Sequence, residues 1–424
     1  MQRRQFLQTS ALATALLGGM PLSATAKTAK GKVVVIGGGY GGATAAKYLR
    51  LLSGNRLDVT LVEPNSTFIS CPMSNLVVGG IRKINEISTP YTGLVRNHGV
   101  KMVKDYVTAI DVEKRTVKLK NGKTLPYDKL VLSPGIDLQL DKIEGLAAAN
   151  ANGQILQAWK AGPETLGLRK QLEAMPDGGT YVLNVPLAPY RCPPGPYERA
   201  SMVANYFKQY KPKSKVLLLD ANADVTSKGK LFKGVWASEY KGILEYRPNM
   251  KVTGVDGATK TVRFEFEDPI KGDVLNILPE QRAGKLAVDS GIANLNKRWA
   301  EVNYMTFEST VAPNVHVIGD SVQGAPQMPK SGHMANSQAK VVAAAIVAQL
   351  SGWEPNATPL TNNTCYSYVT TNNVIHVASV HVYNAEKKTF LPVEGSGGVS
   401  TAPNELEGTY AWNWAQNIWA DTLV

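Results

Sequence analysis

The sequence predicts an α/β fold of two Rossmann-like domains of the dinucleotide-binding type, followed by a C-terminal α+β domain. Two βαβ starts predict this fold, one at Lys32 and one at Thr180, together with a late strand that ends in Gly319-Asp320 and would close the first domain. The chain has 424 residues, 44% of them hydrophobic, which is too long for one ordinary domain and enough for two or three sizeable cores.

The first 26 residues are expected to be a signal peptide. Arg3 and Arg4 precede a short apolar stretch at residues 11–20, and Ala24-Thr25-Ala26 supplies a small-residue cleavage site. The arginine pair is typical of twin-arginine export of folded proteins, although a general secretory leader would have the same destination. No later window reaches the roughly 20 apolar residues of a membrane span. We therefore expect a soluble periplasmic protein without a transmembrane segment.

The first βαβ unit carries a complete dinucleotide fingerprint. A buried strand at Lys32–Ile36 leads into a turn in which Gly37, Gly39 and Gly42 allow a tight bend, close approach of a pyrophosphate and close helix packing. A helix and a second strand follow, and the second strand ends in Glu63, which can accept hydrogen bonds from a ribose hydroxyl. The pattern predicts a bound dinucleotide at this turn.

Two further segments indicate that this dinucleotide is FAD. Residues 127–135 are typical of the junction where FAD proteins of the disulfide-reductase type leave the first domain, and Asp320 follows the later strand where such proteins bind the ribityl or pyrophosphate region. Lys330 stands just before an apolar helix expected at residues 334–350, whose N-terminus would point at the flavin. We expect Asp320 and Lys330 to contribute to the FAD site.

The second βαβ unit lacks the glycines that a nicotinamide dinucleotide needs. A strand at Thr180–Val185 leads into a proline-rich turn, residues 186–196, that offers neither spare N–H groups nor close backbone approach. Cys192 lies in that turn instead. The sequence therefore predicts that neither NADH nor NADPH exchanges electrons here.

These landmarks divide the chain into domains. A discontinuous FAD-binding domain would comprise residues 31–143 and 286–355, interrupted by a second Rossmann-like domain without nucleotide at residues 144–285. Residues 356–424 would form the C-terminal domain.

The chain has three cysteines, Cys71, Cys192 and Cys365. In an oxidising compartment two of them can pair, and the third needs its own explanation. A pair could be structural or redox-active, and a lone cysteine could be a buried thiol. No cysteine and histidine spacing suits zinc or a c-type haem, so no metal site is expected.

The formal net charge of +12 and a pI near 9.3 invite a nucleic-acid hypothesis. The basic residues are scattered rather than gathered in a run with interleaved aromatics, and export argues against it. A basic face for an acidic protein partner and a generally basic surface remain as alternatives.

Over essentially its whole length the chain resembles the flavoprotein subunit of flavocytochrome c sulfide dehydrogenase, and more distantly sulfide:quinone oxidoreductases and glutathione reductase. The resemblance rests on the twin-arginine leader, the FAD fingerprint, Ser70-Cys71-Pro72, Arg191-Cys192-Pro193-Pro194-Gly195, Thr364-Cys365-Tyr366 and the tryptophan-rich terminus from Tyr410 to Trp419. It implies a fold of the disulfide-reductase, glutathione reductase-like class.

The resemblance also implies roles for individual residues. Cys71 matches a cysteine bonded covalently to the flavin, Cys192 and Cys365 match a redox-active disulfide, Glu198 matches a proposed base and Trp419 an aromatic beside the flavin. Such a protein would oxidise sulfide to sulfur or polysulfide and pass electrons to a separate cytochrome c subunit. From the residues alone, a surface glutamate on a helix that begins near Tyr197 is the favoured interpretation of Glu198.

Two alternatives remain open. A sulfide:quinone oxidoreductase would need an apolar docking surface at its C-terminus, and residues 410–424 have aromatics without flanking basic residues. A non-catalytic flavoprotein, serving as an electron-transfer or assembly module, would have a purely structural disulfide.

Overall fold

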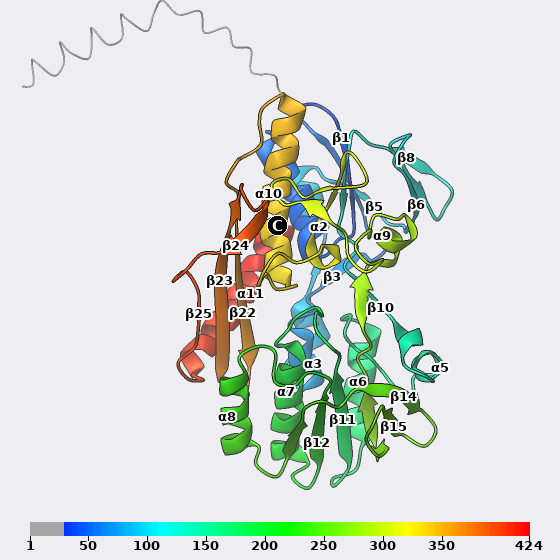
Figure 1. The fold of residues 1–424 in the computed structure, drawn as a ribbon, viewed down its shortest axis with the longest axis vertical. Coiled ribbons are helices and arrows are strands. Elements are labelled where there is room, and N and C mark those ends of the chain that lie inside the picture. The colour runs from blue at the N-terminus through cyan, green and yellow to red at the C-terminus, as the bar shows by residue number, and fades with distance from the viewer. Residues whose placement is uncertain (1–28) are drawn as a thin grey trace, which may run out of the picture.

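The computed structural model describes residues 29–424, and the expected signal peptide at residues 1–26 lies outside them. Two α/β lobes are stacked along the longest axis, and the C-terminal strands and helix lie along one side of both (Figure 1).

The first lobe is built on a seven-stranded sheet with the order β19-β20-β21-β9-β1-β2-β5. Its strands are β1 (Lys32–Ile36), β2 (Asp58–Val62), β5 (Lys101–Val103), β9 (Lys129–Leu132), β19 (Val302–Asn303), β20 (Glu308–Ser309) and β21 (Val315–Val317). The strands β5, β2, β1, β9 and β21 are parallel, which agrees with their nearly continuous apolar sequences. Helices α2 (Tyr40–Leu52) and α10 (Gly332–Ser351) pack against each other beside this sheet.

The chain leaves and re-enters the first lobe through two neighbouring strands. These are β10 (Ile136–Leu138) and β18 (Gln281–Ala283), which pair antiparallel. Strands β9 and β21 are neighbours in one sheet although the whole second lobe lies between them in sequence.

The second lobe has a four-stranded parallel sheet with the order β13-β12-β11-β17. Its strands are β11 (Thr180–Val185), β12 (Lys215–Asp220), β13 (Leu244–Arg247) and β17 (Val274–Asn276). Its main helices are α6 (Pro163–Ala174), α7 (Gly195–Tyr210) and α8 (Gly229–Glu239). Every residue of α7 from Gly195 to Phe207 is buried, so this helix is enclosed on all sides.

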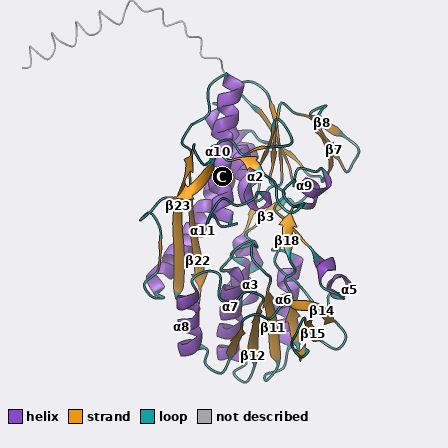
Figure 2. Ribbon diagram, in the orientation of Figure 1, coloured by secondary structure: helices purple, strands orange, loops and turns teal. Residues whose placement is uncertain are grey.

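The C-terminal unit places a long hairpin along one side of the two lobes. Strands β22 (Leu360–Tyr368) and β23 (Val374–Asn384) pair along their whole length, and β24 (Thr389–Pro392) and β25 (Gly398–Val399) pair with β23. Helix α11 (Glu405–Leu423) packs on α2, while β22 contacts both α10 and α7 (Figure 2). Residues of β22 therefore reach both lobes.

Smaller elements complete the fold. They are β3 (Thr67–Ile69), β4 (Ser88–Pro90), β6 (Val107–Asp111), β7 (Thr116–Leu119), β8 (Thr124–Pro126), β14 (Val252–Asp256), β15 (Thr261–Phe264), β16 (Ile270–Lys271), α3 (Ser74–Val78), α4 (Thr92–His98), α5 (Leu146–Ala151) and α9 (Lys285–Asp289). Among residues 29–424, none of the helices has the length and apolar character needed to cross a membrane.

Candidate functional site

A cavity of about 340 Å³ runs along the first lobe and reaches the second. The glycine turn and Glu63 line it together with Cys71 and Cys192. Ser133, Asp320 and the first turn of α10 complete this part of the lining. The cavity thus joins the sequence's dinucleotide fingerprint to two of its three cysteines.

The glycine turn leaves room for a ligand at the N-terminus of α2. A Cβ on Gly42 would lie 1.8 Å from the carbonyl oxygen of Gly37, so only glycine allows the helix to approach the turn. A Cβ on Gly39 would meet nothing within 4 Å, and no side chain caps the helix there. The free N–H groups of this turn suit a pyrophosphate.

Glu63 is fixed at the cavity wall by the backbone of its neighbours. One carboxylate oxygen accepts a hydrogen bond from the N–H of Gly38 at 2.7 Å, and the other accepts from the N–H of Asn65 at 2.9 Å. A carboxylate has about four acceptor positions, so it can still accept from a ribose hydroxyl.

Asp320 and Lys330 differ in how they face the cavity. Asp320 lines it, and its Oδ1 is buried without a hydrogen-bond partner in the described structure. The ammonium of Lys330 instead donates to the carbonyl oxygen of Asp320 at 3.1 Å and lies 3.7 Å from the ring centroid of Trp299. Lys330 is not among the residues that line the cavity. Its backbone carbonyl nevertheless accepts a hydrogen bond from the N–H of Cys192, a lining residue, at 2.8 Å.

These residues fit FAD. The glycine turn suits its pyrophosphate, Glu63 its ribose, and the unpartnered Asp320 oxygen a hydroxyl donor along its ribityl chain. The cavity then leads to Cys71, where the ring system would lie.

Cys71 and Cys192 line the same cavity from different lobes. Cys71 follows β3, and its Sγ accepts a weak hydrogen bond from the N–H of Ala161 at 3.4 Å. Cys192 lies in the proline-rich turn with a φ of 59°, a left-handed conformation that costs a non-glycine residue about 1–2 kcal/mol. The N–H of Cys192 donates to Lys330, which ties the turn to the first lobe.

Cys365 lies on β22, behind the wall of this cavity. Its Sγ is 3.4 Å from Asn363 Nδ2, and Asn363 in turn bonds Ser331, a lining residue. Burial, followed by the charges of Cys365 and Glu198, raises the pKa of Cys192. All three cysteines are free thiols in the structure, so the disulfide between Cys192 and Cys365 stays a prediction.

Glu198 is buried, with 6% of its surface exposed, so it is not a surface glutamate. Its two carboxylate oxygens accept from the backbone N–H of Tyr368 and from Asn75 Nδ2, both at 2.8 Å. Burial raises its pKa to about 7, although these two hydrogen bonds and the charges of Lys228 and Arg199 oppose the shift. A carboxyl group that titrates near neutrality is suited to proton transfer.

Three residues around Glu198 were not identified from the sequence. Asn75 bridges Glu198 and Arg199, and the guanidinium of Arg199 is fully buried and also bonds the carbonyl oxygen of Ala158 at 2.7 Å. Lys228 lies behind β22. The apolar run that follows Arg199 in α7 could have indicated a helix buried on all sides and hence buried charges at its start, whereas nothing in the sequence around Lys228 distinguishes it from a surface loop.

Trp419 lies one side chain away from the cavity. Its indole N–H donates to the hydroxyl of Tyr40 at 3.0 Å, and Tyr40 lines the cavity. The side chain that the resemblance implies beside the flavin therefore reaches the cavity through Tyr40.

The acid at the nucleotide position of the second lobe is occupied by other protein groups. Asp220 is the last residue of β12, whereas Glu63 directly follows β2, and Asp220 is fully buried with its Oδ2 accepting from the hydroxyls of Tyr197 and Tyr246 at 2.8 and 3.1 Å. Its other oxygen accepts from Asn222. The carboxylate of Asp220 therefore accepts its hydrogen bonds from protein groups and leaves no free acceptor for a ribose hydroxyl.

Comparisons with known proteins agree with this arrangement. The family described as "Sulfide dehydrogenase [flavocytochrome c] flavoprotein chain, central" matches residues 165–279, and "Flavocytochrome c sulphide dehydrogenase, flavin-binding" matches residues 357–423. "Pyridine nucleotide-disulphide oxidoreductase" matches residues 31–162.

Individual relatives include sulfide:quinone oxidoreductases. The chain is 25% identical to a mitochondrial sulfide:quinone oxidoreductase of Dictyostelium discoideum over 304 residues, which are 68% of this chain and 65% of that relative. The solved sulfide:quinone oxidoreductase of Aquifex aeolicus is 20% identical and superimposes with a TM-score of 0.74, covering 93% of this chain and 92% of that one. That likeness, with the disulphide-oxidoreductase match, confirms the predicted fold class.

A further relative is a sulfide dehydrogenase [flavocytochrome c] flavoprotein chain of Chlorobaculum thiosulfatiphilum. It is 59% identical over 46 residues, which are 11% of this chain and 94% of that relative. Together with the two family matches, this similarity shows that the chain belongs to the family of flavocytochrome c sulfide dehydrogenase flavoprotein chains.

Proposed function

We propose that this protein is a flavoprotein oxidoreductase that oxidises sulfide through Cys192 and Cys365 and passes the electrons to a c-type cytochrome subunit. FAD occupies the cavity and is attached covalently through Cys71. The observation that carries the proposal is that Cys192 lines the flavin cavity while Cys365 and Glu198 lie beside it. Burial raises the pKa of the Cys192 thiol, and the charges of Cys365 and Glu198 both raise it further.

The two cysteines divide the chemistry between them. In the oxidised protein they form a disulfide, and hydrosulfide attacks the Sγ of Cys365. A sulfur–sulfur bond forms there, the bond to Cys192 breaks, and its electron pair remains on Cys192 as a thiolate. Cys192 receives the electrons because it lines the cavity, and Cys365, which lies behind the wall, keeps the added sulfur.

Glu198 accepts the proton that hydrosulfide brings, since its pKa of about 7 lets it both bind and release a proton at neutral pH. Bound FAD would supply a two-electron acceptor that can release electrons singly. Asn75 and the Tyr368 N–H hold the carboxylate in place throughout.

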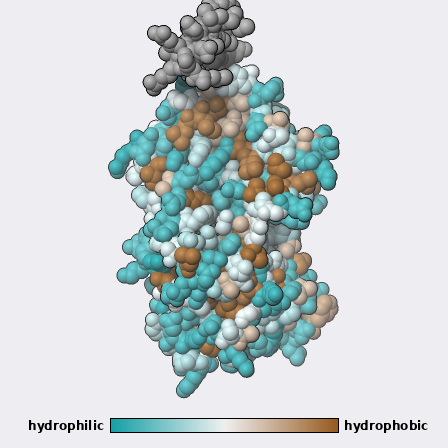
Figure 3. Space-filling view, turned by 90° about the vertical axis from the view of Figure 1, so that its left-hand side faces the viewer, coloured by the Kyte–Doolittle hydropathy of each residue, from teal (hydrophilic) through white to brown (hydrophobic). Residues whose placement is uncertain are grey.

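The C-terminal helix favours a protein acceptor over a membrane quinone. Of the large apolar side chains on α11, only Leu406 and Tyr410 are exposed, and the helix buries its apolar residues against the first lobe. On the face that carries this unit, hydrophobic residues are interspersed with hydrophilic ones (Figure 3). Such a surface lacks the continuous apolar stripe of a membrane-bound helix.

A quinone acceptor is the second candidate, because sulfide:quinone oxidoreductases match most of the chain. We also infer that the protein acts in the periplasm, on the basis of the leader pattern at residues 1–26.

An anaerobic sulfide titration of the flavin-loaded protein tests the activity. Sulfide should bleach the flavin absorbance with about one equivalent per flavin, and a flavin that stays oxidised would favour a non-catalytic module. Mitochondrial-type cytochrome c and decylubiquinone, supplied separately to the sulfide-reduced protein, then test the acceptor. Rapid reoxidation by the cytochrome alone is expected, and preferential reoxidation by the quinone would reverse the assignment.

A further inference from the structure

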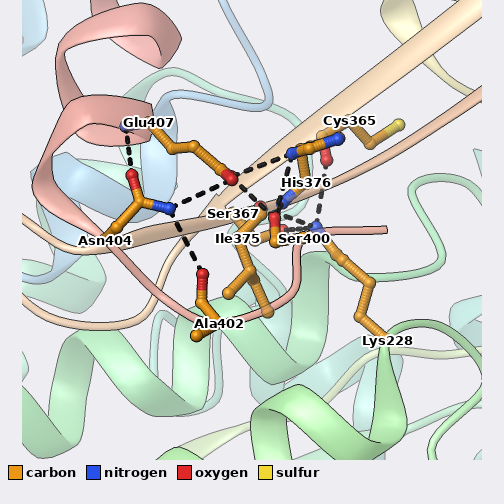
Figure 4. A network of polar contacts seen from close by, with 9 residues as sticks. All are labelled: Lys228, Cys365, Ser367, Ile375, His376, Ser400, Ala402, Asn404 and Glu407. Carbon is orange, nitrogen blue, oxygen red and sulfur yellow. Dashed lines mark hydrogen bonds and ion pairs between the residues drawn. The ribbon is translucent and has the colours of Figure 1, made fainter. Parts of the chain in front are cut away.

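Lys228 is a buried lysine placed directly behind the strand that carries Cys365. It precedes α8 with a φ of 58°, and 8% of its surface is exposed. Its ammonium donates to the carbonyl oxygen of Cys365 at 3.0 Å, to Ser367 Oγ at 2.7 Å and to the carbonyl oxygen of Ile375 at 3.2 Å (Figure 4). The side chain thus fastens the loop before α8 to β22 and β23.

All three hydrogen-bond partners of this ammonium are neutral. Among the ion pairs of residues 29–424, none includes Lys228. A buried charge without a paired anion is costly, and burial lowers the pKa of Lys228 to about 8. The buried ammonium of Lys228 would therefore be compensated by a negative charge that forms only during the reaction.

The titratable groups around Lys228 come from every element packed against it. They are Cys192 of the proline-rich turn, Glu198 of α7, Cys365 of β22, His376 of β23 and Glu407 of α11. Glu407 is already partnered, because it accepts from Ser400 Oγ at 2.7 Å and bonds His376 Nδ1 at 2.9 Å. Figure 4 shows the Glu407 carboxylate directed toward these two residues and not toward Lys228. The groups that the charge of Lys228 can stabilise are therefore the sulfurs of Cys192 and Cys365 and the carboxylate of Glu198.

Of these groups, Cys365 is the one most directly linked to Lys228. Its own carbonyl oxygen holds the ammonium, and the charge of Lys228 is the main influence that opposes the rise in the pKa of the Cys365 thiol caused by burial.

We propose that Lys228 is a positioning residue whose ammonium, held on the backbone carbonyl of Cys365, supplies the countercharge for a sulfur anion at Cys365, which in the proposed reaction is the persulfide left there after Glu198 takes the hydrosulfide proton. The inference deepens the proposed function and rests on it for its purpose, but the electrostatic coupling itself can be measured without sulfide. Because the ammonium is held by three fixed groups, it stabilises an anion at Cys365 without having to reorient.

The first experiment measures the thiol pKa of Cys365. In reduced, flavin-loaded protein with Cys192→Ser, alkylation of Cys365 by iodoacetamide is followed against pH by peptide mass spectrometry. Lys228→Met keeps the side-chain length without charge, and Lys228→Gln keeps hydrogen-bond donors without charge. Both should move the alkylation midpoint upward by about one pH unit, and Lys228→Arg should restore it. Lys230→Met, which removes an exposed lysine two residues away, should leave the midpoint in place.

Unchanged midpoints in both neutral variants would overturn the proposal, as would an equal shift in Lys230→Met. A reciprocal measurement keeps the test available if the neutral variants fail to retain flavin. Reductive dimethylation of reduced protein with formaldehyde, read against pH, reports the pKa of the Lys228 amine. This pKa should fall in Cys365→Ser relative to the parent, while Lys230 in the same digest stays constant. Equal Lys228 midpoints in the two proteins would contradict the electrostatic coupling.

Neither measurement depends on turnover. If sulfide fails to reduce the flavin while the midpoints shift as expected, the proposed function fails and the electrostatic coupling between Lys228 and Cys365 stands. If sulfide reduces the flavin and the midpoints do not move, Lys228 has no electrostatic role.

Discussion

Glu198 shows how burial can raise the pKa of an ordinary carboxyl group to about 7. The unfolded chain releases its proton near pH 4.5, whereas the folded protein holds it until about pH 7. Between these values the native state binds the extra proton, so wild-type stability falls as the pH rises through this window.

Glu198→Gln removes that titration. The free energy of unfolding of the variant, relative to wild type, should therefore increase between pH 4.5 and 7, by up to about 3 kcal/mol. Urea unfolding at pH 5 and pH 8 measures the difference, with Glu394→Gln, an exposed glutamate, as the control. Sulfide-driven flavin reduction should slow by about 100-fold or more. Parallel stability profiles for wild type and Glu198→Gln would mean that the carboxyl group titrates normally.

The Cys71→Ser variant tests whether the flavin is attached covalently. Cys71 lines the same cavity as the glycine turn, where a flavin ring could meet it. Acid precipitation of wild-type protein should leave the yellow colour in the pellet, and Cys71→Ser should release it into the supernatant while binding FAD noncovalently. Free flavin released from the wild type would show that no covalent bond exists.

The same residues show what the sequence could predict about the site. Gly37, Gly42 and Glu63 belong to one local fingerprint, so their roles follow from spacing alone. Glu198 depends on Tyr368, which is 170 residues away in sequence. No local pattern encodes such a contact, and only the family resemblance singled Glu198 out.

The turn between β11 and α7 replaces a nucleotide site with a cysteine. Prolines remove the N–H groups that a pyrophosphate would need, and Asp220 at the neighbouring strand end is saturated by Tyr197 and Tyr246. NADH and NADPH should therefore not reduce the flavin at rates relevant to turnover. Stopped-flow absorbance after mixing with either nucleotide measures this, and rapid bleaching would show that the second lobe still binds one.

Strand β22 was harder to anticipate than β11. The apolar run of β11 indicates a buried parallel strand, and the structure has that strand at Thr180–Val185. The sequence of β22 is polar, with Asn362, Asn363 and Thr364 before Cys365, and its position depends on packing against α10 and α7. That docking, rather than local propensity, brings Cys365 to the cavity and Lys228 behind it.

The protein joins two lobes and a C-terminal hairpin around the proposed reaction centre. The first lobe contributes the flavin cavity and Cys71, the second contributes Cys192 and Glu198, and the hairpin contributes Cys365. The alternating βαβ pattern was sufficient to predict the two lobes, because each sheet is built from local strand and turn signals. The hairpin reaches the site through contacts between residues far apart in sequence. Local strand and turn signals could not predict these contacts.

The central claim is that Cys192 and Cys365 act as one catalytic pair. Its most direct test is anaerobic reduction of the flavin by sulfide in folded, flavin-loaded Cys192→Ser, Cys365→Ser and the double variant. Each single change should abolish the reduction, and the double change should add no further loss, because either one removes the same bond. A purely structural disulfide would instead cost about 2–5 kcal/mol of stability and leave sulfide-driven reduction intact. Near-normal flavin reduction in either single variant would contradict the mechanism.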